Sequence, residues 1–257
     1  MVILSIETST KVCSAALLET EWSENDGATS KVVSSCIDRA GGNHAKQLPL
    51  FVEQLIQTAK RDGLSVDAVA LSEGAGSYTG LRIGTSTAKG LCYGLNIPLI
   101  PIPTTEVLCA TFKASVAGEN ARVSGKGVDD RSLLLPMIDA RRMEVYTALY
   151  DAAIQPLTPV QAVIVGQENV SLWPSAVSRT GDVYYFGDGA AKCQEILESD
   201  SWHFVPDIVP DAACMGALAQ TRMAAGKACM TTAEIAYFEP FYLKEFVAAK
   251  SQVKGLG

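Results

Sequence analysis

The chain has 257 residues, and its 48% apolar content can build a core in one large domain or two smaller lobes. Its 21 basic and 28 acidic residues give a net charge of −7, which disfavours independent binding to nucleic acid. Seven widely spaced cysteines without a Cys-x-x-Cys motif indicate reduced, buried thiols. The sequence shows no basic leader and no apolar run of bilayer length, so we expect a cytoplasmic protein that does not bind a membrane.

Two segments share the plan of a strand, a short polar turn and a second strand. They are MVILSIETSTKVCSAALLE and, far downstream, LLPMIDARRMEVYTALYD. Aligned without gaps, Asp139 falls on Glu7, so each hairpin carries a carboxylate at the end of its first strand. A later segment, VYYFGDGAAK, matches VALSEGAG in the same way, with Asp188 on Glu73. This order favours a duplication into two related lobes, and the alternative is two unrelated hairpins of similar composition.

Helices and strands alternate between the first hairpin and residue 112. Apolar spacing predicts a helix at about 45–60, and a second helix at about 80–94 follows the glycine-rich turn before the strand IPLIPIP. The first lobe is therefore expected to be α/β and to cover residues 1–112.

Polar composition predicts two long loops and a second, reduced lobe. We expect a hairpin loop at residues 20–31 and an interlobe loop at 113–131, where apolar periodicity is lost. The second lobe is expected over 113–257, with a C-terminal helix near 211–226 that can pack back on the first lobe.

The glycine-rich stretch GAGSYTGLRIG lies where many proteins hold a phosphate, between a strand and a helix. It matches neither the Walker loop nor the dinucleotide fingerprint, because the spacing of its glycines differs from both. A helix that starts at this turn, capped by Ser77 or Thr79, could still hold an anion with help from Arg82.

These motifs together resemble the TsaB (YeaZ) family. The resemblance rests on ILSIETST, NHAKQLPLFVEQL, GAGSYTGLRIGTSTAKGL, IPLIPIPT and MIDARRMEVYTALY, in this order and spacing. The family loop usually reads Gly-Pro-Gly-Ser-Phe-Thr-Gly, so this chain departs from it at Ala75 and Tyr78. The resemblance implies an actin-like (ASKHA, ribonuclease-H-like) α/β fold of two related lobes, with mixed sheets flanked by helices.

The resemblance also implies a function. Such a protein would be a non-catalytic dimerisation or scaffold subunit that is required for N6-threonylcarbamoyladenosine modification of tRNA. Its expected partner is a TsaD-like catalytic protein, with a TsaE-like ATPase in a larger complex and a homodimer as a further possibility. It would meet tRNA only through the complex.

The histidines that hold the metal of catalytic relatives have no counterpart here. Those relatives place a His-x-x-x-His pair after the strand that corresponds to IPLIPIP, whereas this sequence has Thr104, Thr105 and Glu106. The remaining histidines, His44 and His203, are far apart in sequence. We therefore expect no metal site and no catalytic residue, and we interpret His44 as a capping or surface group.

A residual nucleotide site is the alternative from a different class. Glu7 and Asp139 occupy positions where actin-like ATPases place carboxylates near a nucleotide and its cation. With Thr8, Ser77, Thr79 and Arg82, they could form a vestigial anion or nucleotide site of a weak ATPase or small-molecule kinase. A structural role for Glu7 and Thr8 in their own turn is favoured, so ATP and Mg²⁺ are not expected to bind tightly.

The two helices of the first lobe carry the predicted partner interface. The first helix has more apolar residues than the single stripe that would cover the sheet. The second helix has a row of small residues that would let another helix approach closely. The alternative is that the sheet and the second lobe bury these residues, and the family resemblance favours the interface. The predicted interface residues are Leu48, Phe51, Val52, Leu55, Ile56, Gly80, Gly84 and Ala88.

Overall fold

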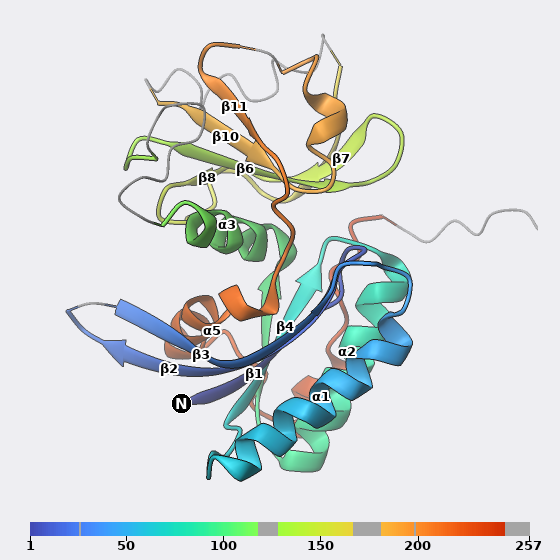
Figure 1. Cartoon of the computed structure of the whole chain (residues 1–257), viewed down its shortest axis with the longest axis vertical. Helices are drawn as coiled ribbons and strands as arrows, with labels where there is room; N and C mark the ends of the chain where they lie inside the picture. Colours follow the sequence, from blue (N-terminus) through green and yellow to red (C-terminus); the bar gives the residue numbers. More distant parts are fainter. Residues whose placement is uncertain (26, 118–127, 167–180, 198, 245–257) are drawn as a thin grey trace, which may run out of the picture.

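The computed structural model describes residues 1–25, 27–117, 128–166, 181–197 and 199–244, and these form two lobes, each built on a sheet (Figure 1). The first sheet contains β1 (Val2–Glu7), β2 (Cys13–Ser23), β3 (Gly27–Asp38), β4 (Ala68–Gly74) and β5 (Leu99–Pro103). The second contains β6 (Leu133–Asp139), β7 (Glu144–Thr147), β8 (Tyr150–Asp151), β9 (Gln161–Ile164), β10 (Val183–Phe186) and β11 (Trp202–Val205). The helices are α1 (His44–Arg61), α2 (Tyr78–Leu95), α3 (Thr104–Ser115), α5 (Gly216–Ala224), α6 (Thr232–Tyr237) and the 3₁₀ helices η2 (Ala191–Cys193) and η3 (Ala212–Cys214).

The two sheets repeat one strand order. The first runs β3-β2-β1-β4-β5, with antiparallel pairs from β3 to β1 and parallel pairs from β1 to β5. The second runs β9-β7-β6-β10-β11 with the same directions, and β8 also pairs with β6. This repetition supports the predicted duplication and the ribonuclease-H-like, actin-like fold. Glu7 and Asp139 therefore end equivalent strands, as the aligned hairpins indicated.

Each sheet is covered on both faces. Along β1, Leu4 belongs to the core beneath α1 and α2, whereas Ile3 belongs to the core beneath η3 and α5. Strands buried on both faces read as continuous apolar runs, which explains the sequence of β1. In the second lobe, α3 packs on the sheet, and the ring of Phe112 stacks on Phe186 with centroids 4.6 Å apart.

The chain returns to the first lobe after β11. Helix α5 contacts β2, β3 and β5, and α6 contacts α2. Cys229 adds to the edge of β5, where its backbone N–H donates to the Leu99 carbonyl at 2.8 Å. The C-terminal part of the predicted second lobe thus completes the first, with the helix expected near 211–226 present as η3 and α5.

One predicted loop is wrong, and part of the other lies outside the described residues. The segment 20–31 is mostly paired strand, because the ladder between β2 and β3 continues to the Ser23 and Gly27 pair. Its polar side chains reflect an exposed hairpin rather than an irregular loop. Of the predicted interlobe loop, residues 118–127 are not among those described.

The row of small residues on α2 faces the protein's own first lobe, so its predicted contact with a partner helix is wrong. A Cβ at Gly80 would overlap the carbonyl oxygen of Thr8, and one at Gly84 would overlap the Thr8 hydroxyl. Ala88 is fully buried in the core between the first sheet and its helices. Small residues allow close approach, but they do not identify the neighbour, which here is the turn after β1.

Leu48 and Leu55 of α1 need the same correction, whereas Val52 packs in the core and also lines an open groove between α1 and α2. Leu48, Val52 and Leu55 belong to the core that packs α1 against the first sheet. Phe51 and Ile56 are only partly buried and pack at the margin of this core. The predicted apolar stripe therefore exists, but most of it covers the sheet.

Replacement of Gly84 by alanine should lower the free energy of unfolding by about 1–3 kcal/mol, because the added methyl group overpacks the contact with Thr8. Gly94→Ala is the matched control in the same helix, since a Cβ there meets nothing within 4 Å. It should raise stability by up to about 1 kcal/mol through helix propensity. Urea unfolding checks both, and equal effects of the two substitutions would contradict the packing of α2 on Thr8.

Candidate functional site

Glu7 lies at the end of β1, near the junction of the lobes, and its side chain is enclosed. The backbone N–H and the hydroxyl of Ser9 both donate to Oε1 of Glu7 at 2.5 Å. Burial raises the pKa of Glu7, and hydrogen bonds from Ser72 and Ser9 offset this only in part. The turn thus holds the Oε1 atom of Glu7, while the buried Oε2 atom has no hydrogen-bond partner among the described residues.

The glycine turn is seated directly on the turn after β1. The Thr8 hydroxyl donates to the Gly80 carbonyl at 2.8 Å, and the Ser77 backbone N–H donates to the Ser9 carbonyl at 2.6 Å. A Cβ at Gly76 would overlap that same Ser9 carbonyl. The glycines thus permit contact between two segments of backbone, and protein atoms fill the inner side of the turn.

The residues predicted to start α2 divide into separate roles. Ser77 is the N-cap, and its hydroxyl accepts a hydrogen bond from the Gly80 N–H. Thr79 is exposed. Arg82 lies 4.9 Å from the centroid of the Tyr78 ring and is hydrogen-bonded to Tyr242. The guanidinium is therefore engaged with aromatic side chains.

The partner of Arg82 comes from a segment that the sequence did not single out. Tyr242 packs on Tyr78 with ring centroids 5.1 Å apart, and the Phe241 N–H donates to the Glu73 carbonyl at 2.7 Å. Lys244 then forms an ion pair with Glu144 of the second lobe. The aromatic run FEPFY was the available signal. This C-terminal segment crosses the N-terminal end of α2 and links the lobes.

Asp139 belongs to a cluster in the second lobe. It forms an ion pair with Lys192, and its backbone N–H donates to Asp188 Oδ1 at 2.9 Å. Although burial opposes it, hydrogen bonds from Lys192 and Arg141 lower the pKa of Asp139, whereas burial raises the pKa of Asp188. Of the six residues proposed for a vestigial site, Glu7, Thr8 and Ser77 therefore share one hydrogen-bonded cluster, and Asp139 has its own partners.

The start of α3 ties the lobes together at the place where the family resemblance expects metal-binding histidines in catalytic proteins. Hydroxyls of Thr104 and Ser72 lie 2.8 Å apart, and the Thr105 hydroxyl lies 2.7 Å from that of Tyr150 in the second lobe. Glu106 accepts a 2.7 Å hydrogen bond from Arg222 of α5. Within the described ranges, no group of three or more histidine, cysteine, aspartate or glutamate side chains could hold a metal ion.

His44 also has a structural position. Its Nε2 atom lies 3.0 Å from the Thr10 carbonyl and 3.2 Å from the Val12 carbonyl, so it joins the start of α1 to the turn after β1. His203 pairs with Asp182 at 2.8 Å in the second lobe. Among the helices that the structure describes, none has the length and apolar character to cross a membrane.

An open groove runs between the outward faces of α1 and α2 and encloses about 560 Å³. Of the predicted interface residues, Val52 and Ile56 line it. Pro49, Gly90 and Leu91 line it as well, and of these Pro49 and Leu91 come from positions outside the stripes that sequence reasoning considered. The groove is one feature of the first lobe that could accept an apolar partner segment.

In a comparison with known families, one family model matches most of the chain. The family model described as "TsaD: tRNA N6-adenosine threonylcarbamoyltransferase" matches residues 38–251. The curated relative from Bacillus subtilis strain 168, "tRNA threonylcarbamoyladenosine biosynthesis protein TsaB", is 29% identical over 168 residues, which are 64% of this chain and 63% of the relative. Its Escherichia coli K12 counterpart is 32% identical over 150 residues, covering 58% and 55%. The chain thus spans about six-tenths of the length of these relatives.

Two further comparisons concern the transferase itself and the fold. The tRNA N6-adenosine threonylcarbamoyltransferase of Halalkalibacterium halodurans is 37% identical over 113 residues, which are 39% of this chain and 31% of that protein. The structure of YeaZ from Pseudomonas aeruginosa superposes with a TM-score of 0.71 at 22% identity and covers 94% of this chain and 99% of that one. At this identity, the superposition establishes the shared fold.

Replacement of Glu7 by glutamine should remove a pH-dependent loss of stability. Because the pKa of Glu7 lies above its ordinary value of 4.5, its contribution to stability is fully present below pH 4.5 and is lost as pH rises through the folded-state pKa. Glutamine does not ionise, so the melting temperature of Glu7→Gln relative to the native chain should increase as the pH rises above 4.5. A relative melting temperature that stays constant over this range would contradict the burial of an ionisable Glu7.

Proposed function

This chain belongs to the TsaD protein family as a TsaB (YeaZ)-type member, and we propose on that premise that it is a non-catalytic subunit that pairs with a TsaD-like protein. In this role, it supports the formation of N6-threonylcarbamoyladenosine in tRNA in the cytoplasm. A TsaE-like ATPase in a larger complex, and a homodimer of this chain when the partner is absent, belong to the same proposal.

The groove between α1 and α2 is the observation that carries the proposal. It is open, and its apolar lining residues Pro49, Val52, Ile56 and Leu91 are bordered by polar ones, namely Glu53, Gln57, Lys60, Ser86 and Thr87. Leu50 of α1 is 53% exposed nearby in sequence. An open apolar groove on a soluble lobe fits a protein partner. We assign this partner as the TsaD-like protein, because 113 residues of such a transferase resemble part of this chain and two related lobes can pair through equivalent helices.

The arrangement around α3 supports a non-catalytic role. Thr104, Thr105 and Glu106 use their polar atoms to contact Ser72, Tyr150 and Arg222, so these groups stabilise the junction of the lobes. Catalysis in the complex then belongs to the TsaD-like partner, and this chain meets tRNA as part of that complex.

Tight binding of Mg·ATP to the isolated chain is not part of the proposed function. The inner side of the glycine turn packs on Ser9, and Glu7 is hydrogen-bonded within its own turn. Both features oppose the weak ATPase or kinase function considered from the sequence. Calorimetric titration of the isolated chain with Mg·ATP tests this, and tight binding would favour that alternative.

Reconstitution with the TsaD-like protein tests the main proposal. The two purified proteins should co-elute in gel filtration, and tRNA modification by the TsaD-like protein should require this chain. Modification at the same rate without this chain would overturn the proposed function, as would failure of the two proteins to associate.

Gly90→Leu should weaken association with the TsaD-like protein by tenfold or more, because the new side chain fills the groove. A Cβ at Gly90 meets nothing within 4 Å, so the chain itself should stay folded. Gly94→Leu is the matched control, since its position is equally open but does not line the groove. Tenfold corresponds to about 1.4 kcal/mol, which calorimetry of the complex resolves.

If both variants associate like the native chain, the groove is not the partner site. Circular dichroism and thermal melting of each variant ensure that a loss of association is not a loss of folding.

A further inference from the structure

The tip of the β6–β7 hairpin has an unusual backbone. Arg141 and Arg142 are consecutive residues with φ of 69° and 51°, in the left-handed region that non-glycine residues seldom adopt. Glycine and asparagine occupy this region at lower cost than arginine. Two arginines therefore strain this turn, and such strain indicates that the side chains serve a purpose other than the turn.

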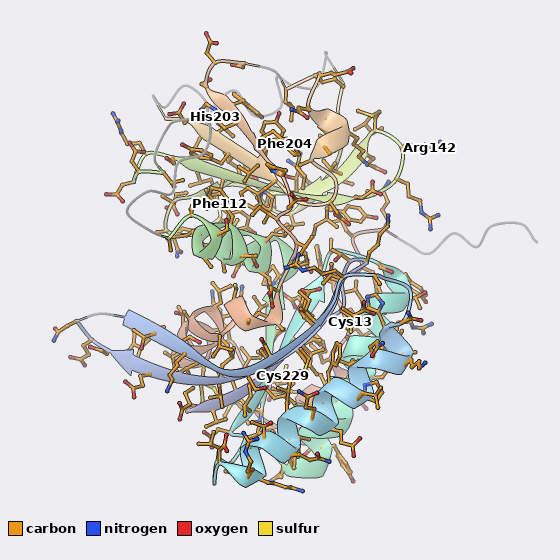
Figure 2. The ribbon with its side chains drawn as sticks, viewed as in Figure 1. Cys13, Phe112, Arg142, His203, Phe204 and Cys229 are labelled. Carbon is orange, nitrogen blue, oxygen red and sulfur yellow. The ribbon has the colours of Figure 1, made fainter. Side chains whose placement is uncertain are left out.

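Arg141 and Arg142 have no acidic partner among the described residues. No ion pair joins either side chain to a described carboxylate, and the Arg141 backbone N–H is the group that contacts Asp139. In Figure 2, the Arg142 side chain extends from the outer edge of the second lobe, away from the protein. The hairpin thus presents two positive charges to the surroundings.

Other basic residues lie on the same side of the molecule. Figure 1 shows the β6–β7 hairpin at the outer edge of the second lobe, on the same side of the molecule as the junction of the lobes, where the N-terminal end of α2 and the C-terminal segment lie. Lys11, from the turn after β1, is close enough to influence Asp139 and Asp188 across this junction. We call the set Lys11, Arg82, Arg141, Arg142 and Lys244 the basic rim.

Glu239 lies near Tyr242, and three other acidic groups beside the basic rim are already engaged. Glu144 pairs with Lys244, and Asp139 pairs with Lys192. Asp188 accepts the Asp139 N–H, and burial raises its pKa, which lessens its negative charge. Lys244 and Glu144 balance each other, so the local excess of positive charge comes from the other members of the rim, on a chain whose net charge is −7.

Aromatic side chains are interleaved with these basic groups. Phe241 and Tyr242 are 41% and 36% exposed, and Tyr242 contacts both Arg82 and Tyr78. Tyr146 of β7 lies near Arg141 and Lys244. Basic groups bind phosphates, and exposed aromatic rings stack on unpaired bases, so the combination suits RNA with single-stranded regions.

We propose that the basic rim binds the phosphate backbone of tRNA, with Arg141 and Arg142 as its principal contacts. This inference rests on the proposed function, which brings tRNA to the complex, and it adds a direct contact from this chain. The overall negative charge keeps the contact weak in the isolated chain, so it acts together with the RNA contacts of the TsaD-like partner.

A double variant removes the charges while improving the turn. Arg141→Asn with Arg142→Gly, the Asn-Gly variant, places residues that tolerate positive φ at both positions, so the chain should melt at the same or a higher temperature. The probe is bulk tRNA with a fluorescent label, and anisotropy is measured with the complex of this chain and the TsaD-like protein at several salt concentrations. Affinity should fall about tenfold, and the slope of log K against log salt should become shallower by about 1.4 to 1.8, as expected for two lost phosphate contacts.

Two controls separate this contact from other effects. Arg141→Lys with Arg142→Lys keeps the charge and should retain most of the affinity and the native salt slope. Lys31→Gln with Arg61→Gln removes two charges from exposed side chains of β3 and α1, outside the basic rim, and should change neither quantity. Unchanged affinity and slope in the Asn-Gly variant would overturn the inference, as would an equal loss in the Lys31 and Arg61 variant.

Gel filtration of each variant with the TsaD-like protein distinguishes this inference from the proposed function. The Asn-Gly variant should form the complex normally while binding tRNA more weakly. If it no longer forms the complex, the hairpin is a protein interface and the RNA assignment is overturned. If the native chain forms no complex at all, the proposed function itself has failed.

Discussion

The seating of α2 on the turn after β1 is the contact on which the rest of the first lobe depends. Gly76, Gly80 and Gly84 have no side chains at the points where Thr8 and Ser9 approach most closely. Hydrogen bonds from Thr8 to the Gly80 carbonyl and from the Ser77 N–H to the Ser9 carbonyl then fix the register. Because packed interiors tolerate little added volume, this contact sets where α2 lies on the sheet and hence the shape of the groove beside α1.

A phosphate-binding loop and this turn both contain glycines, but the glycines serve different purposes. In the former, missing side chains open backbone N–H groups to a ligand. Here, the missing side chains leave this space to the turn after β1 of the same chain, and Ser9 occupies the position that a ligand would take. A strand, glycine turn and helix therefore identify a close backbone approach, but the approaching group must be known before a function can be assigned.

Sequence reasoning was accurate where a local pattern determines the structure. The spacing of Leu48, Val52 and Leu55 predicted α1, and the alignment of Glu7 with Asp139 predicted the repeated sheet topology. Polar composition led to the wrong prediction of a long loop at residues 20–31, because an exposed hairpin and a loop have similar composition.

Sequence reasoning could not predict contacts between segments that are far apart in the sequence. The partner of Gly84 is Thr8, and the partner of Arg82 is Tyr242, and no periodicity connects either pair. The strain at Arg141 and Arg142 was equally hidden, because a backbone dihedral angle depends on the closure of the hairpin as well as on residue type. The candidate site was therefore predicted as a set of residues, while its division into clusters required the fold.

The return of the chain to the first lobe after β11 has a consequence for the order in which the protein is made. The face of the first sheet that contains Ile3, Ala70 and Ile102 is covered by Ala212, Met215 and Ala219. On the ribosome, the strands of this sheet therefore emerge long before the residues that cover them, and the whole second lobe is synthesised in between. Until α5 emerges, that apolar face needs another cover, which makes the nascent first lobe a natural client for chaperones.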